Sequence, residues 1–487
     1  MKRSTGTLHI DDDVGSAGEV FRHCFRSSRE ESASIGSSLF RSHLYICLCF
    51  GLGQGATITT ITYATTFLGE EVGAYTNGFF FASFTLTSLV LTNWVVRHRK
   101  IGFVLAYRMS LALFIVYEAT MWIGFWRHEV GEDQRLLVWT GALLGGFGFS
   151  LHWTAQSLIF SATAKHYAQL RHIRVETVNN TFSGIFASIY VLIEMLSKLM
   201  ASVLLLYFDD PWFKFFISFT AATVVAVFHS FLIIDVQPAH DRGDSFNESS
   251  KGGANLALEI MARASGVPTL LWQSRNLKCL MPINVAFGLT AGFLYTYYYD
   301  QTVAKYLGKY AVGFVSAVGP GVCSILAVPL SMLSNRVGRA PVILIGSVCF
   351  TFIACLYLVS KNSQLGNWPT VLLINFLMGI GRAVWENTNK AIYADTFSAK
   401  EVATAFASLY TVTGMLTFLS LFVFPSIPVS LMCTLMLIPA VLMLPAFKMV
   451  RPLSEYESNG EEALALAAYD DDTDDDLEGN DAPTINF

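Results

Sequence analysis

The chain has 487 residues, of which 53% are hydrophobic and only 14% are charged, and its formal net charge is −5. A soluble domain usually carries about 25% charged residues. Here the charges cluster between apolar blocks of about 20 residues, the length that crosses a hydrocarbon core of roughly 30 Å. This pattern excludes an ordinary soluble protein. It predicts an all-α polytopic membrane protein, because blocks of this length satisfy their backbone hydrogen bonds as helices.

Twelve apolar blocks are expected to form transmembrane helices in two groups of six. The predicted spans are 43–67, 73–96, 102–125, 136–160, 181–207, 212–234, 279–300, 310–334, 341–360, 369–393, 402–424 and 428–447. The predicted domains are a disordered N-terminal tail (1–42), a six-helix half (43–235), a polar central loop (236–278), a second six-helix half (279–448) and an acidic disordered tail (449–487).

The basic residues gather on one side of this arrangement. If both tails and the central loop share a side, that side holds most of the 32 lysines and arginines. The short loops agree, with RHRK at 97–100 on that side and GEE at 69–71 on the other. The positive-inside rule therefore predicts that both termini are cytoplasmic. The sequence does not distinguish the plasma membrane from an endomembrane.

Enzyme and cofactor motifs are not found in the sequence. The eight cysteines are scattered, mostly within apolar blocks, so neither a disulfide nor a metal site is predicted. There is no Walker loop, nucleophile elbow, HExxH or nucleotide-binding glycine pattern. We expect a protein that is not an enzyme and has no cofactor. The expected partner is the lipid bilayer, and no nucleic-acid partner is expected.

The tenth predicted span, within MGIGRAVWENTNKAIYAD (378–395), contains three charged residues one helical turn apart. At 100° per residue, Arg382, Glu386 and Lys390 fall with Asn389 on one stripe about 100° wide. Each charge would cost about 2.5–3.5 kcal/mol if it faced lipid, so the stripe is expected to face protein or water. Two interpretations are open. The stripe is either a buried ion-pair cluster or part of a central cavity that contacts an ion or polar ligand.

Spans 4 and 5 supply further candidates for such a cavity. His152 and Gln156 share a face of span 4, which occupies in the first half the place of span 10 in the second. His152 either titrates near neutral pH or is a hydrogen-bonded core residue. Glu194 and Lys198 form an i,i+4 pair in span 5, which either faces the cavity or neutralises itself at a helix interface.

Two more candidates lie in spans 1 and 3. Glu118 in span 3 is expected to pair with Arg382 or Lys198 across the bundle. Gln54 lies in a first span rich in glycine and threonine, whose small residues favour close helix packing, with a ligand-facing helix as the alternative.

The loop after span 8, LSNRVGRAPVILIG (333–346), resembles the major facilitator superfamily signature G-x-x-x-D-R-x-G-R. Arg336, Gly338 and Arg339 match, whereas Ser331 replaces the first glycine and Asn335 stands in place of the aspartate. We expect the basic residues to bond to helix C-termini and to hold two helices in register.

Spans 4 and 10 carry a closer resemblance. GGFGFSLHWTAQSLIFSATAKHY (145–167) and MGIGRAVWENTNKAIYADTFSAKEVATAFASLY (378–410) resemble the Unc-93-like branch of that superfamily, and the likeness covers most of the chain between the tails. It implies a twelve-helix fold in two six-helix halves.

Two functions are expected. The first is transport of a small polar solute or ion, or control of ion flux, as the polar stripes suggest. The second is a non-transporting regulatory or trafficking subunit of a potassium channel or membrane receptor, because the resembled family includes such proteins.

Overall fold

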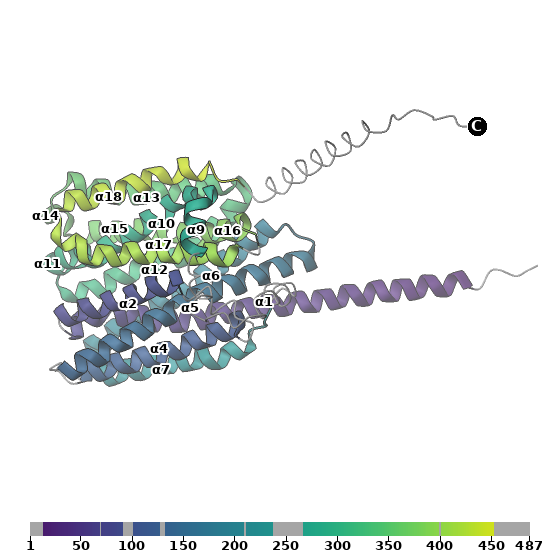
Figure 1. The fold of residues 1–487 in the computed structure, drawn as a ribbon, viewed down its shortest axis with the longest axis horizontal. Coiled ribbons are helices and arrows are strands. Elements are labelled where there is room, and N and C mark those ends of the chain that lie inside the picture. Colours follow the sequence, from purple (N-terminus) through teal and green to yellow (C-terminus); the bar gives the residue numbers. More distant parts are fainter. Residues whose placement is uncertain are drawn as a thin grey trace, which may run out of the picture.

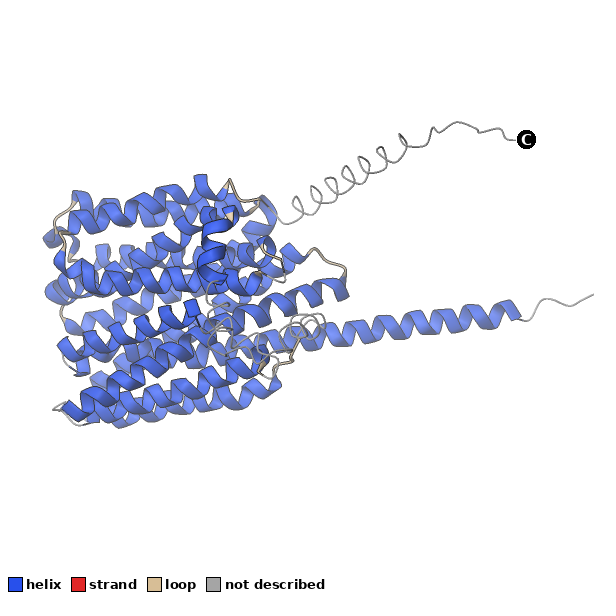
Figure 2. Ribbon diagram, viewed as in Figure 1, coloured by secondary structure: helices blue, strands red, loops and turns tan. Residues whose placement is uncertain are grey.

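The computed structural model describes residues 13–68, 70–90, 101–126, 132–208, 211–236, 266–398 and 401–451, in which all regular elements are helices (Figure 2). The first half contains α1 (Asp13–Leu68), α2 (Glu70–Val90), α4 (Gly102–Trp126), α5 (Glu132–Arg171), α6 (Val175–Tyr207), α7 (Pro211–His229) and the short η1 (Ser230–Leu232). Long antiparallel helices run through the bundle in Figure 1.

The second half has the same number of long helices, two of them containing π-helical segments. It comprises α9 (Gly266–Gln273), α10 (Arg275–Phe293) continued by η4 (Leu294–Ala304) and α11 (Lys305–Leu307), α12 (Lys309–Val337), α13 (Arg339–Val359), α14 (Asn362–Leu365), α15 (Trp368–Ala383) continued by η5 (Val384–Asn389) and α16 (Lys390–Thr396), α17 (Val402–Val423), η6 (Phe424–Ser426) and α18 (Val429–Phe447).

These helices correspond in order to the twelve predicted spans. Within the described residues, ten helical segments are long and apolar enough to cross a membrane, and α2 and α7 complete the set of twelve long helices. The central loop over 237–265 and the tail over 452–487 lie outside the described residues, so the predictions made for them remain predictions.

The first helix begins earlier than predicted. We expected a disordered tail up to residue 42, but α1 is continuous from Asp13, and in Figure 1 it extends well beyond the bundle. The helix α1 therefore occupies residues 13–42, where a disordered tail was predicted. Its membrane-crossing part is Ser34–Ala64, where the sequence becomes apolar. The preceding turns contain glutamate, arginine and alanine, which favour a helix without an apolar face. Hydropathy therefore did not reveal them.

Two pairs of helices join the halves. α6 packs along α12, and α2 packs along α17. Small residues allow the first pair to approach closely: a Cβ placed on Gly184 of α6 would lie 2.8 Å from the Cβ of Ser331 on α12. Two serines also exchange hydrogen bonds across this interface, since Ser188 Oγ donates to Ser324 O at 2.8 Å and Ser324 Oγ donates to Ser188 O at 2.7 Å. The core is therefore continuous across the two halves.

Candidate functional site

Five charged side chains form one connected network between the halves. On α6, Lys198 Nζ lies 2.8 Å from Glu194 Oε1. The carboxylate of Glu194 also accepts hydrogen bonds from both terminal nitrogens of Arg382 on α15, at 3.0 and 2.5 Å. Glu386 on η5 lies 3.6 Å from Arg382 Nε and 3.1 Å from Lys390 Nζ on α16. The bidentate pair between Glu194 and Arg382 is the strongest geometry in the set and joins the first half to the second.

The far end of the network lies in an aromatic cage. Lys390 Nζ is 4.1 Å from the ring centre of Trp153 and 4.4 Å from that of Phe186, with Tyr190 at 5.7 Å and Trp385 at 6.0 Å. The faces of such rings attract an ammonium group. The cage therefore stabilises the charged form of this buried lysine, which is 2% exposed.

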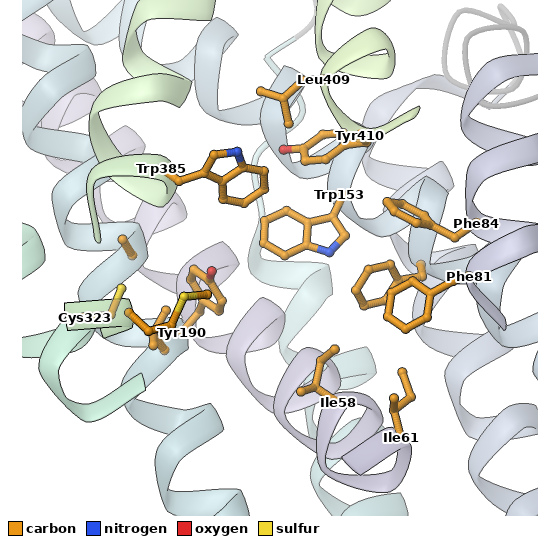
Figure 3. Packing of buried hydrophobic residues seen from close by; sticks show 14 of the residues in the cluster. Ile58, Ile61, Phe81, Phe84, Trp153, Tyr190, Cys323, Trp385, Leu409 and Tyr410 are labelled. Carbon is orange, nitrogen blue, oxygen red and sulfur yellow. The ribbon is translucent and has the colours of Figure 1, made fainter. Parts of the chain in front are cut away.

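A central cavity lies beside the network and is lined from both halves. The space between its lining residues is about 910 Å³, including the part that is open to solvent. Five of the residues predicted for a cavity line it: Gln54, Glu194, Lys198, Arg382 and Glu386. Much of the remaining wall is aromatic, with Phe81, Phe84, Trp153, Phe287, Trp385 and Tyr410 among the rings. Several of these converge on Trp153 in Figure 3.

Arg382 is the charged side chain most accessible from the cavity. Its side chain is 15% exposed, against 4% for Lys198, 2% for Glu386 and 1% for Glu194. Its Nε has no hydrogen-bond partner among the described residues. The wall of the cavity therefore presents a guanidinium group in front of two covered carboxylates.

His152 and Gln156 do not line the cavity, contrary to the expectation that span 4 would present them there. The His152 ring is fully buried, stacked 4.2 Å from Phe50 and 4.8 Å from Tyr107, and its Nδ1 shares a hydrogen bond of 2.8 Å with Ser110 Oγ. The alternative of a hydrogen-bonded core histidine describes this position. Span 4 instead contributes aromatic rings to the cavity, because α5 turns its small-residue face toward α2 and α4.

Glu118 also lies away from the network. It does not pair with Arg382 or Lys198 as predicted, because it faces α7, where Thr223 Oγ1 donates to its two carboxylate oxygens at 2.9 and 3.1 Å. Glu118 is 3% exposed and is buried within the first half of the bundle. Hydropathy and spacing do not indicate which neighbour α4 meets, so the partner of this carboxylate was not predictable.

The predicted stripe of the tenth span is divided in the structure. Asn389 was expected beside the charges, but its Nδ2 donates to Asn284 Oδ1 on α10 at 2.9 Å, and Trp385 Nε1 bonds to the same oxygen at 3.1 Å. The cause is the π-helical segment η5, because i→i+5 bonding places more residues in each turn and each residue advances by less than 100°. Asn387 consequently meets α6, where it accepts a hydrogen bond from Ser183 Oγ at 2.6 Å.

The structure also shows a polar group of the cavity wall that was not predicted. Asn375 donates to Tyr298 Oη at 2.6 Å and accepts from Tyr299 Oη at 3.3 Å, and both Asn375 and Tyr299 line the cavity. The tyrosines belong to YTYYYD (295–300), which resembles an aromatic belt at a membrane interface. A signal was present, since Asn375 lies seven residues before Arg382 and therefore on the same helix face.

Metal and disulfide chemistry is not indicated in the described part of the chain. No group of three or more histidine, cysteine or acidic residues there is placed to hold a metal ion. The cysteines whose side chains are described are free. Cys24 is not among them.

Comparisons with known proteins agree on the fold. The model of the Major Facilitator Superfamily matches residues 280–466. The proton:xylose symporter XylE bound to 6-bromo-6-deoxy-D-glucose is 12% identical and has a TM-score of 0.58, covering 86% of this chain and 97% of the symporter. A mutant of the nucleoside transporter NupG is 11% identical with a TM-score of 0.52, covering 85% of this chain and 100% of NupG. At these identities the likeness establishes the fold alone.

A curated human protein is similar to part of the chain. "Protein unc-93 homolog A" from Homo sapiens is 27% identical over 146 residues, which are 30% of this chain and about a third (32%) of that protein's length. The chain is thus similar in part of its length to an Unc-93-like protein and to the model of the major facilitator superfamily. The predicted fold class is confirmed. The chain is a multi-pass membrane protein by its long apolar helices.

The loop that resembles the superfamily signature joins helices of both halves. Asn335 Oδ1 accepts a hydrogen bond of 2.7 Å from Asn180 Nδ2 on α6. Arg339 on α13 donates to Asn180 Oδ1 at 3.1 Å and forms an ion pair with Asp395 on α16. Asp395 also accepts a hydrogen bond from Asn179. An aspartate from another helix thus pairs with the loop arginine, where the signature's own aspartate is absent.

Gly338 makes the turn of this loop. It connects α12 and α13 as a single residue with φ 86° and ψ 176°, a conformation that is essentially restricted to glycine. Arg336 lies in the last turn of α12 and is exposed, and a positive charge at this position interacts favourably with the helix dipole.

Proposed function

We propose that this protein carries a small polar solute or ion across a membrane by alternating access between its two six-helix halves. The observation that carries the proposal is the ion pair between Glu194 and Arg382, which joins the halves in the wall of a central cavity. Carriers with paired halves bind their solutes near the bilayer midplane between the halves. Intramembrane charges are costly, and they commonly mark a solute or ion pathway.

The geometry supports a simple cycle. With the cavity empty, the carboxylate of Glu194 satisfies Arg382 and holds α6 against α15. A solute with its own polar groups competes for the same guanidinium group, which loosens the contact between the halves. Because a bound solute changes this contact between the halves, it shifts the population of conformations. The basic residues on the side of the tails support a cytoplasmic location for both termini.

A second candidate is a non-transporting regulatory or trafficking subunit. It is favoured by one observation: each charged side chain of the cavity wall already has an oppositely charged partner within the chain. Such a cavity is electrostatically tolerable without a ligand, so a bilayer-embedded partner of a channel or receptor is compatible with it.

Flux through purified, reconstituted protein tests the proposal. Counterflow into proteoliposomes is measured with a panel of labelled probes, namely rubidium ion, xylose, an amino acid and benzoate. Wild-type protein is expected to move at least one of them. Arg382→Gln is expected to reduce that flux about tenfold or more, because a charged hydrogen bond is lost. Glu118→Gln removes a buried carboxylate outside the cavity and is expected to retain the flux.

Two results of these measurements contradict the proposal. Folded wild-type protein that moves none of the probes, while a channel or receptor copurifies with it from native membranes, contradicts the carrier and supports the regulatory candidate. If the flux through Arg382→Gln equals that through the wild type, the ion pair between Glu194 and Arg382 has no role in transport.

A further inference from the structure

The charge balance of the network points to the class of solute. Three cations, Lys198, Arg382 and Lys390, are connected to only two carboxylates, Glu194 and Glu386. Four of the five, Glu194, Lys198, Arg382 and Glu386, line the cavity, whereas Lys390 lies in its aromatic cage. An excess of one positive charge in a low-dielectric interior is unfavourable unless an opposite charge is close. A single negative charge in the cavity balances it.

The exposed fractions of these charged side chains favour an anion over a cation as the bound solute. A carboxylate is the strongest partner for a bound cation, but Glu194 and Glu386 are only 1% and 2% exposed and face their own cations. Arg382 is 15% exposed. A guanidinium group has five N–H donors. Two of them bond to Glu194, and the buried Nε, 3.6 Å from Glu386 Oε1, has no hydrogen-bond partner among the described residues.

The side chains that line the cavity indicate the chemistry of the uncharged part of the solute. Rings from both halves, with Trp153 at the centre of Figure 3, surround the space beside Arg382. Aromatic surfaces favour an apolar or aromatic body over a heavily hydroxylated one. Gln54 also lines the cavity, and its buried Oε1 has no hydrogen-bond partner among the described residues.

We propose that the solute is a monovalent organic anion, a carboxylate attached to an aromatic or similarly apolar body. The carboxylate competes with Glu194 for the guanidinium group of Arg382, and the body lies against Trp153 and Trp385. Guanidinium groups match carboxylates in a bidentate geometry, which a lysine does not provide. This inference rests on the proposed function, because it names the solute of the same cavity.

Binding to protein in nanodiscs tests the inference without requiring transport. Isothermal titration compares three probes of similar size and different charge: benzoate, benzyl alcohol and benzylammonium, with chloride as an inorganic anion. We expect benzoate to bind at least about tenfold more tightly than the other three, the ratio that one charged hydrogen bond provides. Equal binding of benzyl alcohol, tighter binding of benzylammonium or binding of chloride alone overturns the proposal.

Two variants change the balance of charge in opposite directions. Arg382→Gln removes the excess positive charge and is expected to weaken benzoate binding about tenfold or more. Glu386→Gln adds to the excess and is expected to strengthen binding severalfold. Glu118→Gln is the matched control and is expected to bind benzoate as wild type does. If Arg382→Gln does not fold, benzoate binding is measured with Arg382→Lys and Glu386→Gln instead. Unchanged benzoate affinity in Glu386→Gln and in the Arg382 variant that folds contradicts the site.

The inference and the proposed function fail in different ways. Counterflow of rubidium ion or xylose, with no binding of benzoate, overturns the anion but leaves a carrier. Tight, Arg382-dependent binding of benzoate, with no flux of any probe, leaves the anion site and contradicts the carrier.

Discussion

Individual buried charges in this protein are stabilised by different surroundings. Glu194 is held by two cations, from its own helix and from the other half. Lys390 has one carboxylate partner and several aromatic rings. Glu118 has only the hydroxyl of Thr223 among the described residues. A substitution at each position therefore has a different expected cost.

Lys390→Met tests how much the buried pair of Lys390 and Glu386 stabilises the protein. The change leaves Glu386 with only the more distant Arg382 Nε, 3.6 Å away, in a buried position. Breaking one partner of a buried ion pair costs about 3–5 kcal/mol, so a clear fall in melting temperature is expected. Intrinsic fluorescence during heating of detergent-solubilised protein measures it.

The controls separate charge from packing. Lys361→Met changes an exposed lysine and is expected to leave the melting temperature nearly unchanged. The double variant Lys390→Met/Glu386→Gln removes both charges and is expected to recover much of the loss. A double variant that melts as low as Lys390→Met shows that packing, and not the unpaired carboxylate, explains the effect.

At the scale of the helices, local backbone geometry determines which side chains meet. The π-helical turn η5 separates the charges of the tenth span, which face α6, from Asn389, which faces α10. The single residue Gly338 sets the direction in which α13 leaves α12, and it thereby brings Arg339 to Asp395. Both features lie outside the regular helical pattern.

Gly338→Ala isolates the contribution of the turn. No atom lies within 4 Å of a Cβ added there, so the cost arises only from the backbone conformation. A non-glycine residue in this region costs about 1–3 kcal/mol. The melting temperature is expected to fall, whereas Val337→Ala, at the exposed neighbouring position, changes it little. Equal melting temperatures for both variants contradict the strain assigned to this glycine.

The twelve helices and the inward direction of the charges were predictable from the sequence. Hydropathy locates apolar blocks well, and the cost of exposing Arg382 or Glu386 to lipid requires them to face inward. The pairs within one helix follow from i,i+4 spacing, as the contacts of Lys198 and Lys390 show.

The contacts between helices were not predictable in the same way. The choice of Glu194 as the partner of Arg382, and of Thr223 as the partner of Glu118, depends on which helices are neighbours. The expectation for Asn389 was wrong because a uniform 100° rotation does not describe a π-helical turn. Of the two alternatives for His152, the hydrogen-bonded core residue describes its position, because a polar residue on a small-residue face also suits a packed helix interface.

Across the whole molecule, the two halves meet along α6 and α12 and along α2 and α17, with the cavity between them. The polar contacts of Asn180, Asn335, Arg339 and Asp395 join the halves at the end of α12. The serine pair Ser188 and Ser324 joins them near the middle. A carrier that alternates between two forms has to separate some of these contacts during each cycle.

Cross-linking the two halves tests this account most directly. Ser188→Cys/Ser324→Cys replaces two residues that already exchange hydrogen bonds across the interface, so a disulfide is expected to form under oxidation. In proteoliposomes, flux of the probe that wild type moves is expected to fall to background after oxidation. A reducing agent is expected to restore it, and each single cysteine variant is expected to remain active in both conditions. Equal flux through the oxidised, fully cross-linked protein and the reduced protein would contradict alternating access between these halves.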